Sequence, residues 1–367
     1  MPSVSAPSHA LRLRDAYEDK FLVGTALSIE ALRGKDLVST AIAQSQFNAF
    51  TAENSMKPAL VQPVPGEFYW TEADRMVELA EECGATPIGH TLVWHQQTPR
   101  WFFQTAEGEP LSCERALGNM RTHIAEVAGR YKGRVKQWDV VNEAISDIPG
   151  EELRSSPWLE VAGEEFIAEA FRAAHAADPD AVLIYNDYNI ELGEKRDKTL
   201  RLLKRLLDDE VPIHAVGIQG HWHLDVPNLN EIEEAIKQFA ALGLRVMITE
   251  LDLSVLPSNY QGADISVRQE LEPELNPYRH GLPDTVALRQ AKRYEEMFQL
   301  FLRYQSVIDR VTFWGVHDGI SWLNNFPVRG RTDYPLLFDR EHRPKPALAA
   351  VAREAHGASR VAVPCRS

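Results

Sequence analysis

The stretch Val135-Lys-Gln-Trp-Asp-Val-Val-Asn-Glu-Ala144 decides how this chain is expected to fold. Its centre is apolar and β-branched, which favours a strand that is buried on both faces, as in a parallel sheet. The strand ends in Asn142 and Glu143, two polar residues that a buried strand carries only where its end opens into a site. A second stretch, Arg245-Val-Met-Ile-Thr-Glu-Leu-Asp-Leu253, has the same form and carries Glu250. We therefore expect two carboxylates, from two strands, to converge on one substrate.

Strand-like apolar runs alternate along the chain with amphipathic helical segments, and there are eight such runs. This alternation predicts a parallel sheet covered by helices, and eight repeats predict a single (β/α)₈ TIM barrel of the α/β class. The predicted strands cover residues 21–27, 47–54, 86–95, 135–144, 181–189, 215–222, 245–253 and 311–318. The predicted helices cover about residues 33–44, 71–83, 112–132, 163–177, 194–209, 228–241, 285–304 and 346–354.

Helix boundaries and loops agree with this organisation. Ser112 is a predicted N-cap, although Arg115 replaces the Glu of a full capping box. The longest irregular stretch, residues 254–284, is expected to form a wall of the cleft. Glycines follow three predicted helices where a C-cap glycine is expected, at Gly84, Gly133 and Gly243.

No linker or low-complexity tract divides the chain. We therefore assign residues 1–15 to an N-terminal arm, 16–356 to one (β/α)₈ catalytic domain and 357–367 to a C-terminal tail. Roughly the first 25 residues lack a positive segment followed by a long apolar one, so no signal peptide is recognised. We expect a cytoplasmic protein, or a secreted one whose signal has already been removed.

Composition and charge exclude several classes of function. The 367 residues carry 39 Lys and Arg against 53 Asp and Glu, a net charge of −14. Nucleic acids and anionic membranes require clustered Lys and Arg, so neither is an expected partner, whereas an uncharged polymer is compatible. No stretch approaches about 18 consecutive apolar residues, which excludes a membrane-spanning helix. Scattered cysteines are interpreted as free thiols, at Cys83, Cys113 and Cys365.

Nearly every predicted strand ends in hydrogen-bonding side chains or indoles, at the end of the barrel where active sites lie. Amides and carboxylates bind sugar hydroxyls, indole faces pack on pyranose rings, and a pair of carboxylates is what glycoside hydrolysis requires. The strand ends carry Glu53, Asn54 and Lys57; His90, Trp94 and His95; Asn142 and Glu143; Asn186, Asp187, Tyr188 and Asn189; Gln219, His221 and His223; Glu250 and Asp252; and Trp314, His317 and Asp318.

Seven segments, in order along almost the whole chain, resemble glycoside hydrolase family 10, whose typical activity is endo-β-1,4-xylanase. One departure is Pro58, where many relatives carry Trp. The segments are Thr51-Ala-Glu-Asn-Ser-Met-Lys57, Gly89-His-Thr-Leu-Val-Trp-His95, Trp138-Asp-Val-Val-Asn-Glu-Ala144, Tyr185-Asn-Asp-Tyr-Asn189, Gly217-Ile-Gln-Gly-His-Trp222, Ile248-Thr-Glu-Leu-Asp252, and Phe313-Trp-Gly-Val-His-Asp318 with Trp322.

The resemblance implies a retaining endo-β-1,4-xylanase in which Glu143 is the general acid/base and Glu250 is the nucleophile. Asn142 would bind the 2-hydroxyl of the sugar being cleaved. Independently of the resemblance, Asp252 is expected to orient His221, because it is two residues from Glu250 and points the same way from the strand, and Asp139 is expected to support the site from behind. The other implied substrate-binding residues are His90, Trp94, Gln219 and His221 around that sugar, Glu53, Asn54 and Lys57 at the next sugar toward the non-reducing end, Trp314 and Trp322 over that side, and Tyr188 and Asn189 toward the leaving group.

The chemistry gives reasons for these roles and leaves alternatives. Retaining hydrolysis requires the two carboxyl groups about 5–5.5 Å apart and in different protonation states, and it uses no metal or cofactor. His221 and His223 suggest a metal pair, but such a pair belongs on the first barrel strand.

The substrate is expected to be xylan or xylo-oligosaccharide, with β-1,4- or β-1,3-glucans as the nearest alternative. A non-catalytic sugar-binding barrel is the rival from another class. We expect a monomer, with a homodimer as the alternative.

Overall fold

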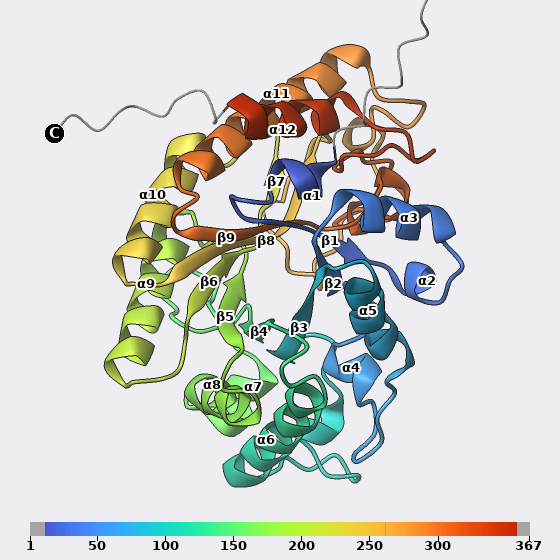
Figure 1. Ribbon diagram of the computed structural model, residues 1–367. Coiled ribbons are helices and arrows are strands. Elements are labelled where there is room, and N and C mark those ends of the chain that lie inside the picture. The colour runs from blue at the N-terminus through green and yellow to red at the C-terminus, as the bar shows by residue number, and fades with distance from the viewer. Residues whose placement is uncertain (1–11, 261, 358–367) are drawn as a thin grey trace, which may run out of the picture.

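The stretch around Trp138 forms β4 (Gln137–Asn142), a strand in which every residue is buried. The computed structural model describes residues 12–260 and 262–357, and in it β4 belongs to a closed barrel of parallel strands ringed by helices (Figure 1). The predicted (β/α)₈ barrel is therefore confirmed. The strands are β1 (Leu22–Leu27), β2 (Ala49–Ala52), β3 (Thr86–Trp94), β4, β5 (Val182–Asp187), β6 (Ala215–Ile218), β7 (His221–His223), β8 (Arg245–Ser254) and β9 (Ile308–Phe313).

Six of the predicted strands differ from the observed ones by at most two residues at either end, and the other two differ more. The strand predicted at residues 215–222 is interrupted after Ile218, because Gly220 has φ +83° and turns the chain; β6 and β7 both pair with β8. The strand predicted at residues 311–318 is β9, which begins at Ile308 and ends at Phe313, since Gly315 has φ +136°. After the first break His221–His223 form the short strand β7, whereas the residues that follow Phe313 belong to a loop.

Helices lie between the strands, as predicted, and boundaries shift by a few residues. Ser112 is the N-cap of its helix, with its hydroxyl accepting from the Arg115 amide, and Gly84, Gly133 and Gly243 have positive φ. The long helices are α3 (Leu37–Gln46), α5 (Thr71–Glu82), α6 (Cys113–Arg130), α8 (Phe166–Ala177), α9 (Gly193–Asp208), α10 (Leu229–Ala241), α11 (Asp284–Arg303) and α12 (Pro346–Gly357). Short helices not predicted are α1 (Leu13–Ala16), α2 (Ile29–Leu32), α4 (Pro58–Val61) and α7 (Pro157–Ala162).

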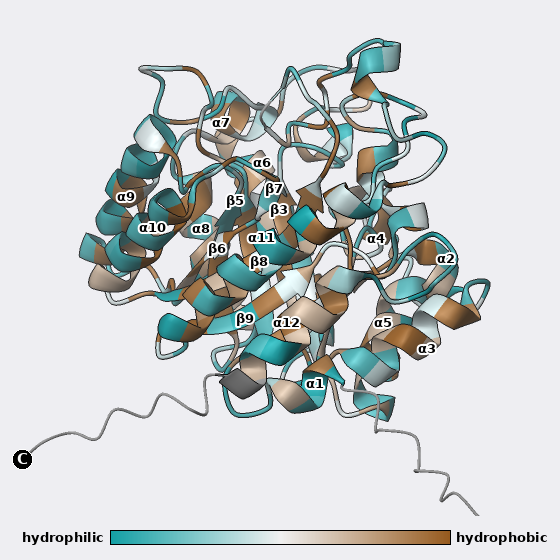
Figure 2. Ribbon diagram, turned by 90° about the horizontal axis from the view of Figure 1, so that it is seen from above, coloured by the Kyte–Doolittle hydropathy of each residue, from teal (hydrophilic) through white to brown (hydrophobic). Residues whose placement is uncertain are grey.

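The side view of the barrel separates its two ends. Figure 2 shows the loops that follow the strands at one end, with α7 among them, and α1 and α12 at the other end. Leu13, within the expected N-terminal arm, is fully buried. The rest of that arm up to residue 11, and the expected tail from residue 358 on, lie outside the described residues. None of the helices in the described part of the chain is long and apolar enough to cross a membrane.

Close packing inside the barrel wall requires glycine at one position. Gly89 of β3 pairs with Trp138 of β4, and a Cβ added at Gly89 would lie 2.0 Å from the Trp138 ring. No side chain fits at that distance, so the indole packs directly on the β3 backbone. This packing brings the carboxyl ends of β3 and β4 together.

A buried arginine crosses the barrel interior below the strand ends. Arg310 is fully buried, and its guanidinium donates to Gln137 Oε1 at 2.8 Å and to Thr312 Oγ1 at 2.7 Å. Its Nη2 atom lies 3.9 Å from Asp139 Oδ1. Burial lowers the pKa of Arg310, and the negative charge of Asp139 opposes this change. The guanidinium thus connects β4 and β9 across the barrel.

Arg310→Ala is expected to destabilise the protein by about 3–5 kcal/mol, because it leaves the buried Asp139 without its nearby cation and Gln137 without its hydrogen-bond donor. The measurement is the free energy of unfolding in urea. Arg303→Ala is the matched control, since Arg303 is exposed and lies 3.5 Å from Glu233; such surface pairs contribute about 0–1 kcal/mol. Equal effects of the two substitutions would contradict a structural role for the buried guanidinium.

Candidate active site

The two strand-end glutamates open into one cavity. Glu143 and Glu250 both line a space of about 140 Å³ at the carboxyl ends of the strands. This cavity brings together all the predicted catalytic and substrate-binding residues except Tyr188 and Asn189. It is lined by Glu53, Asn54, Lys57, His90, Trp94, Gln97, Asn142, Glu143, Gln219, His221, Glu250, Ile265, Trp314 and Trp322.

Irregular backbone aims the side chains into this cavity. Glu143 directly follows β4 and has φ +58°, a left-handed conformation that is uncommon for a residue with a side chain. Its amide donates to the Asn186 carbonyl at 2.8 Å, and its own carbonyl accepts from Arg154 Nε at 3.1 Å. The register of β3 with β4 also shifts between His90 and Val93, as at a β-bulge. These distortions turn the chain so that Glu143 leaves the strand direction.

Glu143 is surrounded by neutral hydrogen-bond donors. Its carboxyl oxygens accept from Trp94 Nε1 at 2.9 Å, Gln219 Nε2 at 3.0 Å and Asn142 Nδ2 at 3.2 Å. Burial and the negative charge of Asp187 raise the pKa of Glu143 to about 7, although the bonds from Gln219 and Trp94 oppose this rise. Glu143 can therefore hold a proton near neutral pH.

Glu250 is surrounded by positive charge. Its carboxylate accepts from Asn186 Nδ2 at 2.7 Å and lies 3.3 Å from His221 Nε2. Burial alone would raise the pKa of Glu250. The pKa is instead lowered to about 2 by the charge of His90, by the hydrogen bond and charge of His221, and by the charge of Lys57. Between about pH 2 and pH 7, Glu250 is therefore ionised while Glu143 holds a proton.

Two asparagines bridge the carboxyl groups. Asn186 Nδ2 donates both to Glu250 Oε1 and to Asn142 Oδ1, the latter at 2.8 Å, and Asn142 in turn donates to Glu143. Asn186 was one of the polar strand ends in the sequence but was assigned no role. Its position depends on Gly217, where an added Cβ would lie 2.4 Å from Asn186 Oδ1 and 2.7 Å from Thr249 Cγ2.

Two further carboxylates, Asp252 and Asp139, contact histidines of the cavity. Asp252 Oδ1 lies 3.0 Å from His221 Nδ1, and Asp252 Oδ2 accepts from Trp322 Nε1 at 2.8 Å. Burial would lower the pKa of His221, but Asp252 and Glu250 raise it to about 10. His90 Nδ1 lies 2.9 Å from Asp139 Oδ2. His221 is therefore a cation held between two carboxylates.

One side of the cavity combines charge with indole faces. Lys57 Nζ donates to Asn54 Oδ1 at 3.2 Å and lies 4.8 Å from the centroid of the Trp94 ring. The Trp314 ring meets His90 edge-on, with ring centroids 5.1 Å apart, and the Trp322 ring packs on Phe326. Such a surface offers both hydrogen bonds and flat apolar contact to a sugar.

Tyr188 and Asn189 do not line this cavity. Tyr188 is buried because Lys195 Nζ lies 3.5 Å from its ring centroid and its hydroxyl contacts Asp147 and Arg154. Asn189 lines a small neighbouring space together with His221. The expectation that Tyr188 and Asn189 line the leaving-group side stays a prediction.

Two residues of the cavity escaped the sequence analysis because loops supply them. Gln97 follows β3, and its Nε2 atom lies 3.4 Å from Asn54 Oδ1. Ile265 belongs to the long loop after β8, which was expected to form a wall of the cleft. Arg154 holds this loop through Asp264 at 3.2 Å while also binding the Glu143 carbonyl. An isolated isoleucine in a loop gives no signal in sequence.

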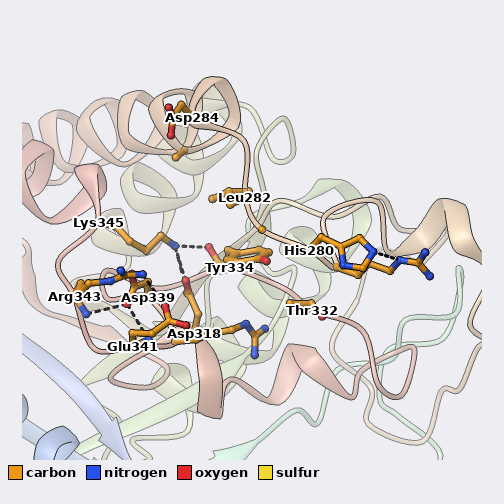
Figure 3. Close-up of a pocket in the computed structure, with 14 residues that line it drawn as sticks. His280, Leu282, Asp284, Asp318, Thr332, Tyr334, Asp339, Glu341, Arg343 and Lys345 are labelled. Atoms are coloured by element: carbon orange, nitrogen blue, oxygen red, sulfur yellow. Dashed lines mark hydrogen bonds and ion pairs between the residues drawn. The ribbon is translucent and has the colours of Figure 1, made fainter.

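A larger cavity of about 590 Å³ lies elsewhere, between the loop after β9 and the start of α11. Figure 3 shows its charged wall, where Lys345 Nζ lies 3.0 Å from Asp318 Oδ2 and donates to the Tyr334 carbonyl at 2.6 Å. None of the predicted catalytic or substrate-binding residues lines it. The chemistry therefore belongs to the smaller cavity.

Comparison with known proteins gives consistent matches over almost the whole chain. The family model described as "Glycosyl hydrolase family 10" matches residues 12–354. A "Beta-1,4-xylanase" of Dictyoglomus thermophilum is 42% identical over 93% of this chain and 90% of its own length. An "Endo-1,4-beta-xylanase" of Geobacillus stearothermophilus is 41% identical over 92% of this chain and 96% of its own. A solved GH10 endoxylanase from a sugarcane soil metagenome superimposes with a TM-score of 0.89 at 44% identity, covering 93% of this chain and 99% of that one.

Gly217→Ala is expected to lower kcat about 100-fold with little change in KM, because the methyl group displaces Asn186 from Glu250 and Asn142. Steady-state kinetics measure both constants. Gly118→Ala is the control, since an added Cβ there meets nothing within 4 Å. A Gly217→Ala protein that keeps the parent kcat would show that the asparagine bridge is dispensable.

Proposed function

Because the chain belongs to glycosyl hydrolase family 10, we propose that it is a retaining endo-β-1,4-xylanase, cleaving internal β-1,4 bonds of xylan and xylo-oligosaccharides. The observation that carries the proposal is a pair of buried carboxyl groups in one cavity, with the pKa of Glu143 raised to about 7 and the pKa of Glu250 lowered to about 2. Retaining hydrolysis requires one proton donor and one ionised nucleophile in that arrangement.

In the first step Glu250 attacks the anomeric carbon while Glu143 protonates the departing glycosidic oxygen. The bond between the anomeric carbon and that oxygen breaks, and an ester bond forms between the sugar and Glu250. The proton of Glu143 leaves with the shortened chain as a hydroxyl group. Hydrogen bonds from Asn186 and His221 hold the Glu250 carboxylate for this attack.

In the second step water replaces the carboxylate. Glu250 has lost its negative charge in the ester, so a negative charge on Glu143 costs less and its pKa falls. Glu143 then accepts a proton from water, the resulting hydroxide attacks the anomeric carbon, and Glu250 is released as a carboxylate. Both displacements invert the anomeric carbon, so the net result is retention.

The remaining residues of the cavity support substrate binding in this proposal. Asn142 binds the 2-hydroxyl of the sugar being cleaved, and Asp252 and Asp139 fix the orientation of His221 and His90. The lining residues around that sugar are His90, Trp94, Gln219 and His221, and those toward the next sugar are Glu53, Asn54, Lys57, Trp314 and Trp322. Each step uses side chains of this chain and water.

Xylose fits the cavity better than glucose, because xylose lacks the hydroxymethyl group for which the cavity would need additional room. The cavity is small, and indoles, Gln219 and Lys57 line it. The names of the relatives also support xylan as the substrate. β-Glucans remain the alternative within the same chemistry. A sugar-binding protein without catalysis is disfavoured, because both carboxyl groups are present with opposed protonation.

An aryl xylobioside is expected to have a kcat/KM at least about 10-fold higher than the matching aryl cellobioside, since one extra group in a fitted pocket changes discrimination by about 1–3 kcal/mol. Initial rates at low substrate concentration measure the ratio directly. Equal values would defeat the assignment to xylan while leaving the glycosidase chemistry intact.

The two glutamates are expected to respond differently to removal. Glu250→Ala abolishes activity on every substrate, because no nucleophile remains. Glu143→Ala abolishes xylan cleavage but spares the first step on aryl glycosides whose leaving groups need no proton, and added azide restores turnover by replacing the activated water. Release of the aryl group and of reducing ends measures both effects.

Glu126→Ala on the exposed surface of α6 is the matched control and should retain the parent rates. If Glu143→Ala cleaves polymeric xylan at nearly the parent rate, the roles assigned to the two carboxyl groups are wrong.

A further inference from the structure

Three side chains from distant parts of the sequence meet outside the catalytic cavity. Asp36 precedes α3, His317 follows β9, and His342 lies in the loop before α12. Asp36 Oδ2 lies 3.7 Å from His317 Nε2, and Asp36 Oδ1 lies 3.8 Å from His342 Nε2. One ligand atom from each residue lies within 4.8 Å of the other two. None of the three lines the cavity that holds Glu143 and Glu250.

The facing nitrogens of the two imidazoles have no hydrogen-bond partner in the protein. His317 is only 5% exposed, and its buried Nε2 atom is unpaired, as is the buried Nε2 atom of His342. The two rings pack with centroids 4.1 Å apart. A buried polar atom without a partner costs free energy, so each such atom calls for an explanation. A ligand shared by both nitrogens would supply one.

We propose that Asp36, His317 and His342 bind a divalent transition-metal ion, with Zn²⁺ as the best fit. Two imidazole nitrogens and one carboxylate oxygen suit Zn²⁺, Co²⁺ and Ni²⁺, whereas Ca²⁺ and Mg²⁺ select oxygen ligands. Water would complete the coordination. Bonds of about 2.0–2.1 Å to a tetrahedral Zn²⁺ place ligand atoms about 3.4 Å apart. The pairs at 3.7 and 3.8 Å use different oxygens of Asp36, and one ligand atom from each residue lies within 4.8 Å of the other two, so metal binding requires the three side chains to close by up to about 1.4 Å.

Binding requires a change of tautomer at one histidine. The Gly319 amide donates to His317 Nδ1 at 3.2 Å, which leaves the proton of a neutral ring on Nε2, facing Asp36. To bind metal through Nε2, the ring must carry its proton on Nδ1 instead, and the Gly319 hydrogen bond must open. The proton is moved from one ring nitrogen to the other with no net release. Metal binding should therefore alter the environment of the Gly319 amide.

The site would join three segments that follow different parts of the barrel. His317 lies close in sequence to Trp314 and Trp322, which line the catalytic cavity. Figure 3 shows Asp339 and Glu341 paired with Arg343, and His342 lies between them and Arg343 in the sequence. Asp339 and Glu341 are not part of the proposed site, to which this loop contributes His342. A bound ion would stabilise the fold and take no part in hydrolysis, so the proposal is independent of the proposed function.

The test uses the full chain, stripped of metal with a chelator. Calorimetric titration with Zn²⁺ measures binding, and thermal unfolding with and without Zn²⁺ measures the change in Tm. We expect one saturable site per chain and a rise in Tm of about 3 °C or more at 100 times Kd. Mg²⁺ at the same concentration should change nothing. The Gly319 amide resonance should shift on addition of Zn²⁺.

His342→Ala and Asp36→Asn should remove both the titration and the rise in Tm, whereas His280→Ala, a substitution at an exposed histidine elsewhere, should retain them. His342 is partly exposed, so its variant is expected to fold even if substitutions at the buried His317 do not. Absence of saturable Zn²⁺ binding, or the same rise in Tm in the His342→Ala protein, would overturn the proposal.

Discussion

Two carboxyl groups that must differ in protonation share one buried cavity, and the rest of the structure depends on keeping them different. Burial by itself pushes the pKa of both glutamates upward. Positive charge and hydrogen bonds reverse this effect at Glu250. At Glu143 the negative charge of Asp187 adds to it, and the hydrogen bonds from Gln219 and Trp94 and the charge of Arg154 oppose it only in part. Glu143 and Glu250 are the same type of side chain, so their environments determine which one donates the proton and which one is the nucleophile.

The barrel supplies this difference by placing unlike elements around the cavity. Glu250 faces His221, whose positive charge Asp252 maintains, and the charge of Lys57 also acts on it. Glu143 faces the indole of Trp94 and the amide of Gln219. The asparagine bridge then fixes the two carboxyl groups relative to each other, and Gly217 leaves it room. Backbone strain at Glu143 is the local cost of turning that side chain inward.

Much of the fold and site could be predicted from sequence because each barrel strand carries its own signal. Apolar runs that end in polar residues predicted the strands, and the positions of Glu143, Glu250 and His221 followed from them. What could not be predicted depends on tertiary contacts. The break at Gly220, the bridging role of Asn186 and the contribution of Ile265 arise from packing between distant segments. The contacts of Tyr188 with Lys195 and Arg154 likewise join distant segments and give no signal in the sequence.

The stereochemistry of the first product tests the central claim most directly. If Glu250 attacks the sugar and water then displaces Glu250, the sugar released at the start of hydrolysis must be the β-anomer. Proton NMR, recorded on an aryl β-xylobioside before mutarotation, resolves the two anomers. Accumulation of the β-anomer is the result predicted here. Initial formation of the α-anomer would contradict it, because a single displacement by water would then have occurred.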